Sequence, residues 1–446
     1  MGLISDRAGV RLLSPARRIR RQAPVKDHRA CALLFDESPC AASGVTAALL
    51  DALRKASAKA TFAVYGSTEA LYPDRCGKRE KESGRGVQYA HLPDWQKDTQ
   101  GGARHCPELI RQIQADGHAI AVSNDTFQPN GRPWFSRRKA FQTAEESYQS
   151  IQQLMSAEAL AGAAISAHLP PFDAAMLPDG RTVYDVCNAL GMNCLSPAVS
   201  YASNFYREND GKAEAERIVR SVQARLHDDS GWFDGKVIRM DGGLAPTLTE
   251  PAVPLAISRV LRLLQAAGYE LLTVDELVAR SPFADLDASA ESFEAACDLL
   301  KRGYTVGCLG GTFRPDAEMQ RDALYAMMVP PHIMQDYMIS RLMKTEPAYG
   351  VNRRYEKEFL MAPGSPASAG MFYAYEAGWP LGKRQAVVTA RDFIAFLDRV
   401  SAGKTLDWTP PKERALLKSD IIMALDQLIR AEQAEYDEQE QKTVSE

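Results

Sequence analysis

The sequence predicts an α/β fold, a barrel of seven strands and surrounding helices, followed by a small all-α region. From about residue 28 to 280, short apolar segments alternate strictly with amphipathic helical patterns, which is typical of a parallel sheet covered by helices. Seven strands and six intervening helices suit a barrel of roughly 250 residues better than the alternative, an open doubly wound sheet. After residue 282 the patterns are mostly helical.

The predicted strands are short and apolar, and they cover 30–36, 60–65, 118–122, 164–168, 194–199, 237–240 and 271–274. Apolar residues at helical spacing predict helices at 45–56, 107–115, 143–159, 182–190, 213–226 and 251–267. Helix 45–56, for example, places Leu49, Leu50 and Leu53 on one face. The stretch 68–105 is polar, glycine-rich and without a period, so we expect a long insertion there.

Composition and net charge limit the classes of protein to which this chain can belong. At 446 residues the chain is long enough for two or three domains. Its net charge of −4 gives no electrostatic case for nucleic acid as a partner. Segment 1–27 is rich in arginine, and we expect a basic, disordered arm. No apolar stretch has the length of a transmembrane segment or of a secretion signal.

Five segments carry a resemblance to a known family. The segment "ALLFDESPCAASGVTAALLDALRKASAKATFAVYGS" resembles the opening of the polysaccharide deacetylase (NodB-homology carbohydrate esterase) family. Four more segments keep the order of that family, namely "PELIRQIQADGHAIAVSNDT", "SAHLPPFD", "KVIRMDGG" and "LRLLQAAGYELLTVDELV". The resemblance spans about 28–280, and it implies a NodB-like distorted (β/α)7 barrel.

The resemblance also implies a set of site residues. In this family one Asp and two His hold a metal, a second Asp acts as general base, an Arg orients that base, and a late His is the general acid. Asp36 stands at the base position and Glu37 at the carboxylate that binds the metal. The remaining positions depart from the family, with Ser123 and Phe127 at the metal histidines, Leu169, beside His168, at the orienting Arg, and Met240 at the acid His. Asp241 matches an Asp of the family.

These departures predict that metal-dependent N-deacetylation has been lost and that no cofactor is bound, because phenylalanine cannot bind a metal and methionine has no proton to donate. The alternative is a rebuilt site that holds a divalent cation. The carboxylates that we expect at strand ends on one rim are Asp36, Glu37, Asp125, Asp173 and Asp241. Such a cluster suits calcium or magnesium better than zinc. His118 is assigned to the turn that enters the third strand.

A second resemblance follows the first. Segment 283–330 resembles one S-layer homology repeat, with matches at Phe283, Asp285, Leu286, Ala295, Ala296, Gly307, Gly311, Phe313, Pro315, Asp316 and Arg321. The resemblance implies that Arg321 faces an anionic cell-wall glycan. In the mostly helical region 331–446, residues 372–400 form a candidate degenerate second repeat.

Three functions are consistent with these patterns. The first is a cell-envelope protein whose deacetylase-like barrel binds an acetylated glycan or cell-wall polysaccharide without hydrolysing it. The second is an active amidohydrolase with a rearranged carboxylate site. The third is a structural or interaction protein of the cell surface. Both resemblances imply a surface or secreted location, whereas the lack of a visible signal peptide leaves a cytoplasmic one open.

Overall fold

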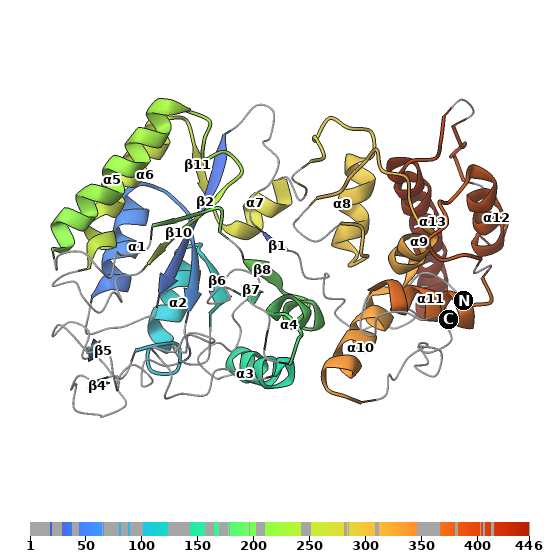
Figure 1. The fold of residues 1–446 in the computed structure, drawn as a ribbon, viewed down its shortest axis with the longest axis horizontal. Helices are drawn as coiled ribbons and strands as arrows, with labels where there is room; N and C mark the ends of the chain where they lie inside the picture. The colour runs from blue at the N-terminus through green and yellow to red at the C-terminus, as the bar shows by residue number, and fades with distance from the viewer. Residues whose placement is uncertain are drawn as a thin grey trace. The chain divides into compact units, whose positions relative to one another are not determined.

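The computed structural model of the chain describes residues 18–19, 29–37, 44–64, 66, 80–81, 88–89, 101–123, 143–156, 165–168, 177, 179–195, 197–201, 210–241, 251–280, 283, 285–307, 312–345, 366–379, 382–401, 403–404, 406–411 and 414–445. The chain divides into two compact units (Figure 1). The first comprises 18–187 and 193–284, and the second comprises 1–17, 188–192 and 285–446.

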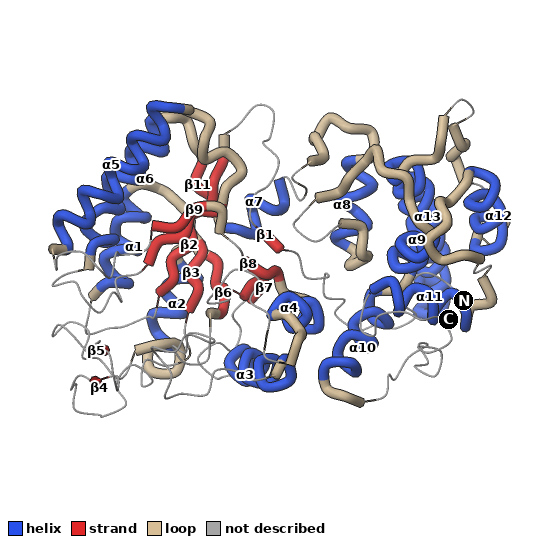
Figure 2. The backbone as a smooth tube through the Cα atoms, viewed as in Figure 1, coloured by secondary structure: helices blue, strands red, loops and turns tan. Residues whose placement is uncertain are grey.

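The first unit is built on a parallel sheet (Figure 2). Its strands are β1 (Arg18–Ile19), β2 (Ala30–Glu37), β3 (Thr61–Val64), β6 (Ala119–Val122), β7 (Ile165–His168), β8 (Asn193–Leu195), β9 (Val199–Tyr201), β10 (Val237–Asp241) and β11 (Glu270–Leu272). Their order is β1-β8-β7-β6-β3-β2-β10-β9, and β11 pairs with β2. Every pairing in this sheet is parallel, which confirms the predicted parallel α/β class.

The predicted helices are present at nearly the predicted bounds. They are α1 (Val45–Lys55), α2 (Pro107–Ala115), α3 (Ala144–Ser156), α4 (Val183–Leu190), α5 (Gly211–Asp228) and α6 (Ala252–Ala266). Leu49, Leu50 and Leu53 of α1 are at most 1% exposed, because the apolar face of the helix packs on the protein. Figure 1 shows α1, α5 and α6 side by side on the sheet. A further helix, α7 (Val274–Arg280), follows β11.

The structure differs from the prediction at two segments and adds detail to a third. The predicted strand 194–199 is divided into β8, which pairs with β7, and β9, which pairs with β10. In the segment that we expected to be a disordered arm, Arg18–Ile19 pairs with β8 and therefore belongs to the sheet. Within the predicted insertion 68–105, β4 (Glu80–Lys81) and β5 (Gln88–Tyr89) form an antiparallel ribbon.

The division into β8 and β9 shows that the sheet is rolled. These strands lie at opposite ends of a run of seven, β8-β7-β6-β3-β2-β10-β9. In a flat sheet they would be about 29 Å apart. The four residue steps from Leu195 to Val199 reach at most about 14 Å, so the two ends must curl toward each other. Among the described residues β8 and β9 are not paired with each other, and the closed barrel stays a prediction.

One face of the rolled sheet is lined by buried apolar residues. Its buried cluster includes alternate residues of β2, namely Ala30, Ala32 and Leu34. Ala63, Ala121 and Ala167 of the neighbouring strands belong to the same cluster. Asp36 continues the alternation of β2, so its side chain lies on this face as well.

The described elements of the second unit are helices. They are α8 (Phe293–Lys301), α9 (Arg321–Met328), α10 (Pro331–Leu342), α11 (Pro366–Glu376), α12 (Ala390–Val400) and α13 (Lys418–Ser445). Helices α9 and α11 cross closely at Gly370, which has no side chain. A Cβ atom added there would lie 2.3 Å from the backbone nitrogen of Ala326. None of the helices in the described part of the chain is long and apolar enough to cross a membrane.

Three helices of this unit begin side by side. Val388 donates its N–H to Met319 O at 2.8 Å, which joins the residues before α12 to those before α9. Lys418 donates its N–H to Ala317 O at 2.9 Å, which adds the start of α13. The candidate repeats at 283–330 and 372–400 thus meet at their helix starts, although their relation to S-layer homology repeats stays a prediction.

Two aspartates of this unit lie between two arginines. Arg430 Nε is 2.8 Å from Asp426 Oδ2 and 3.3 Å from Asp298 Oδ2. Arg302 Nε is 2.9 Å from the same Asp298 oxygen. Burial, followed by the hydrogen bond with Asp298, raises the pKa of Asp426 to about 6. The folded protein therefore binds a proton at Asp426 in a pH range where the unfolded chain does not.

We expect this aspartate pair to make the second unit more stable at pH 5 than at pH 7. The folded pKa of Asp426 is raised, so protonation stabilises the folded state and the contribution is lost as the pH rises through about 6. The difference should be about 1 kcal/mol in the free energy of unfolding, measured by urea denaturation. Asp426→Asn should abolish it, whereas Asp437→Asn, at an exposed position of α13, should preserve it. An unchanged pH dependence in Asp426→Asn would contradict this assignment.

Candidate active site

The strand register brings several predicted site residues to one edge of the sheet. Asp36 pairs with Asp241 of β10 and with Ala63 of β3, and Glu37 pairs with Val64. Val64 in turn pairs with Val122, which pairs with His168. The carboxyl ends of β2, β3, β6, β7 and β10 therefore lie at one level, as expected for the active edge of such a fold.

Ser123 follows β6 at this edge. It is 2% exposed, and its N–H donates to Val64 O at 2.9 Å. The structure places Glu37, His168 and Asp241 by their backbone alone. Leu169, Asp125, Phe127 and Asp173 lie outside the described residues.

The side chain of Asp36 is held by an arginine that the sequence analysis did not single out. Arg239 of β10 donates from Nη2 to Asp36 Oδ2, and the two form an ion pair. Arg239 pairs in register with Leu34, so it lies on the same face as Asp36, and its long side chain reaches one residue pair farther along the sheet. The Asp36 side chain is 6% exposed and that of Arg239 is 25% exposed.

Met240 lies on the other face. It pairs in register with Phe35 and is 1% exposed. Because side chains alternate along a strand, Met240 is directed away from the face that carries Asp36. Of the residues in "RMDGG", Arg239 therefore stands near Asp36, and Met240 does not. The sequence signal for Arg239, which the sequence analysis did not use, was an arginine inside an otherwise apolar strand, two residues before Asp241.

The described residues do not fit the metal centre that the family resemblance implies. Asp36 is the one acidic residue at the edge whose side chain the structure describes, and the guanidinium of Arg239 already balances its charge. A divalent cation beside Asp36 would be repelled by Arg239. The part of the chain that the structure describes contains no group of three or more His, Cys, Asp or Glu residues that could hold a metal. We therefore derive no metal-dependent step from this geometry.

His118 has a structural position at the opposite end of β6. It directly precedes the strand, as the sequence analysis predicted, and it is 7% exposed. Ala60 donates its N–H to His118 Nδ1 at 3.3 Å, and the imidazole packs on Phe62 with ring centroids 5.6 Å apart. Burial lowers the pKa of His118, while the Asp116 carboxylate acts in the opposite direction. The residue joins the starts of β3 and β6.

Arg321 is packed within the second unit. Its side chain is 16% exposed, and Nη2 lies 3.2 Å from Asp392 Oδ2. A Cβ atom at Gly382 would lie 1.9 Å from Nη1 of this arginine, so the guanidinium is packed directly against the glycine. These contacts give Arg321 a role in joining α9 to the start of α12. Its contact with a cell-wall glycan stays a prediction.

Comparison with known proteins supports a polysaccharide deacetylase domain in the first unit. The family model described as "Polysaccharide deacetylase" matches residues 24–160, the part of the chain that contains Asp36, Glu37 and Ser123. The segments "SAHLPPFD", "KVIRMDGG" and "LRLLQAAGYELLTVDELV" lie outside this match. No curated protein matches the chain.

Several solved structures are similar to the chain at low identity. A chitin deacetylase of the fungal pathogen Colletotrichum lindemuthianum is 15% identical, with a TM-score of 0.39 over 59% of this chain and 91% of the other. A CE4-family pseudoenzyme of Bacillus anthracis is 14% identical, with a TM-score of 0.37 over 60% and 70%. A family 4 acetyl xylan esterase of Clostridium thermocellum, in complex with cobalt, is 18% identical, with a TM-score of 0.34 over 55% and 89%.

The ion pair between Asp36 and Arg239 should be coupled in a double-mutant cycle. We expect Arg239→Met to lower the free energy of unfolding by about 2–4 kcal/mol, because it leaves the buried Asp36 carboxylate without this cation. The double variant Asp36→Asn/Arg239→Met should lose less than the sum of the single variants. Arg111→Met, which breaks an exposed pair with Glu108, should change stability by less than about 0.5 kcal/mol. Strict additivity of the two site variants would contradict a direct interaction.

His118 should make the first unit less stable in acid. Its folded pKa is lowered, so its contribution is complete above the unfolded value of about 6.5 and is lost as the pH falls from there through the folded pKa. His118→Asn keeps a hydrogen-bond acceptor near Ala60 and removes the titration. Denaturation between pH 7 and 5 should show a smaller loss of stability in this variant than in the wild type. An equal loss in both proteins would rule out His118 as the cause.

Proposed function

We propose that this chain is a polysaccharide-deacetylase-like protein of the cell envelope that binds a glycan and has lost metal-dependent N-deacetylation. The observation that carries the proposal is the ion pair between Asp36 and Arg239. The residue at the general-base position is bound to a cation on the same face of the sheet. The family match over 24–160 supports the class of protein.

The residues around this pair agree with the proposal. The first metal-histidine position is Ser123, which is buried and has no imidazole to offer. The acid-histidine position is Met240, which is buried on the opposite face. A closed barrel would surround the Asp36–Arg239 pair with the carboxyl ends of the strands. That edge would then serve as a binding surface for acetylated glycan or cell-wall polysaccharide, and the second unit would contribute to attachment at the surface.

A second candidate is a carbohydrate amidohydrolase with a rebuilt carboxylate site. The pairing of Asp241 with Asp36, and the position of Glu37 next to it, favour this candidate because three carboxylates share one strand-end level. In this candidate, carboxylates gathered at that level would outweigh the charge of Arg239 and hold a hard cation such as calcium or magnesium. Metal content therefore separates the two candidates.

The proposed loss of activity is tested by incubating the purified full chain with N-acetylated chitin oligomers and with acetylated peptidoglycan, with and without added divalent metals. We expect no acetate release above the blank, and metal analysis should find less than about 0.1 equivalent of any divalent ion, because serine replaces the imidazole at position 123 and Arg239 balances the charge of Asp36. Asp36→Asn is the matched control and should behave like the wild type. Metal-dependent release of acetate that disappears in Asp36→Asn would contradict the proposal and favour the rebuilt site.

A further inference from the structure

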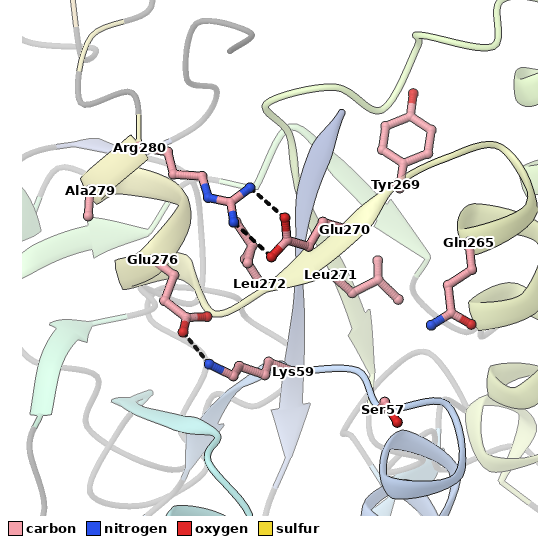
Figure 3. Close-up of a pocket in the computed structure, with 10 residues that line it drawn as sticks. All are labelled: Ser57, Lys59, Gln265, Tyr269, Glu270, Leu271, Leu272, Glu276, Ala279 and Arg280. Carbon is pink, nitrogen blue, oxygen red and sulfur yellow. Dashed lines mark hydrogen bonds and ion pairs between the residues drawn. The ribbon is translucent and has the colours of Figure 1, made fainter. Parts of the chain in front are cut away.

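A pocket of about 520 Å³ lies at the amino end of the sheet in the first unit (Figure 3). The turn after α1, the end of α6, strand β11 and helix α7 surround it. Its volume is in the range of sites for small molecules. Strand β11 pairs with residues 30–32 of β2, which lie four to six residues, or roughly 13–20 Å, before Asp36 along the strand. The pocket is therefore separate from the edge that carries Asp36.

Four charged side chains of both signs line this pocket. Arg280 binds Glu270 through two contacts of 2.7 Å, from Nη1 to Oε2 and from Nη2 to Oε1. Lys59 forms an ion pair with Glu276. Figure 3 shows both pairs on the side of the pocket formed by α7 and β11, with Gln265 and Tyr269 across from them.

These ion pairs are open to exchange with a ligand, unlike the pair of Asp36. The side chains of Arg280 and Glu270 are 33% and 52% exposed, and those of Lys59 and Glu276 are 49% and 37% exposed. Ion pairs with this exposure contribute little to stability. A ligand can therefore replace one partner of each pair, provided that the partners left behind remain in contact with water.

Glu276 is held in place for such an exchange. Thr273 donates its N–H to Glu276 Oε2 at 3.0 Å, and Glu276 donates its N–H to Thr273 Oγ1 at 3.2 Å. This reciprocal cap at the start of α7 fixes the carboxylate. Burial acts to raise the pKa of Glu276, but hydrogen bonds from Lys59 and Thr273 hold it below its ordinary value. The carboxylate is therefore oriented and negatively charged at neutral pH.

We propose that this pocket binds a small zwitterion, a molecule with one carboxylate and one ammonium group, such as a free amino acid or a short peptide. The ligand carboxylate would replace Glu270 on the fork of Arg280, which is suited to two parallel hydrogen bonds. The ligand ammonium would replace Lys59 on Glu276. A ligand of one sign could make only one of these two contacts and would add a net charge to the pocket. The proposal is independent of the proposed glycan function, because it concerns the other end of the sheet.

Three matched probes test the charge requirement by isothermal titration calorimetry on the full chain. Alanyl-alanine carries both charges, N-acetyl-alanine carries the carboxylate alone, and alaninamide carries the ammonium alone. Free alanine distinguishes an amino acid site from a peptide site. We expect saturable binding of at least one zwitterion and affinities at least about tenfold lower for both probes of single charge. The proposal would be overturned if neither alanine nor alanyl-alanine bound saturably. It would also be overturned if N-acetyl-alanine bound as tightly as the zwitterions.

Three variants test the location. Arg280→Gln and Glu276→Gln should each weaken zwitterion binding by about tenfold or more. Glutamine at 276 still completes the cap of α7, so this variant should fold normally. Arg111→Gln, in an exposed ion pair on α2, is the matched control and should bind like the wild type. Zwitterion binding that both pocket variants leave unchanged would place the ligand elsewhere and overturn the assignment.

Discussion

Strand β2 is the element on which the first unit depends. Strand β10 pairs with one of its sides along residues 32–36. On the other side its first half pairs with β11 and its second half with β3. Hydrogen bonds also hold the start of the strand, because Ala30 donates its N–H to Asp234 Oδ1 at 3.1 Å and Arg29 donates from Nη1 to the carbonyl of Ala267 at 3.1 Å. The candidate active edge and the proposed zwitterion pocket are thus positioned by opposite ends of one strand.

The ion pairs at the two ends of β2 differ in burial, and burial determines whether a ligand can replace one partner of a pair. Asp36 and Arg239 form a largely buried pair, and breaking such a pair leaves a desolvated charge. This cost favours a fixed, structural pair at the position where the family resemblance implies a general base. Arg280 with Glu270, and Lys59 with Glu276, are considerably more exposed, so water can solvate either partner after exchange. The proposed exchange with a charged ligand therefore belongs to the exposed pairs at the amino end, and not to the buried pair at the carboxyl end.

The two units are expected to respond to acid in opposite directions. His118 has a lowered pKa because its imidazole is buried, so its contribution makes the first unit less stable in acid. Asp426 has a raised pKa of about 6 because it is buried beside Asp298, so mild acid stabilises the second unit. Burial disfavours the charged form in both cases, and the sign differs because histidine gains a charge on protonation whereas aspartate loses one.

The sequence by itself determined the α/β class, six helices within a few residues, most strands, and the edge at which Asp36 and Glu37 lie. These features follow from local apolar spacing and from the rule that parallel strands share a carboxyl edge. Only the tertiary structure decided the split of 194–199 into β8 and β9, the pairing of Arg239 with Asp36, the burial of Arg321 against Gly382 and the ion pairs around the amino-end pocket. Each of these features joins residues that are distant in sequence, or depends on which face of a strand is covered. Local periodicity in the sequence carries no information about either property.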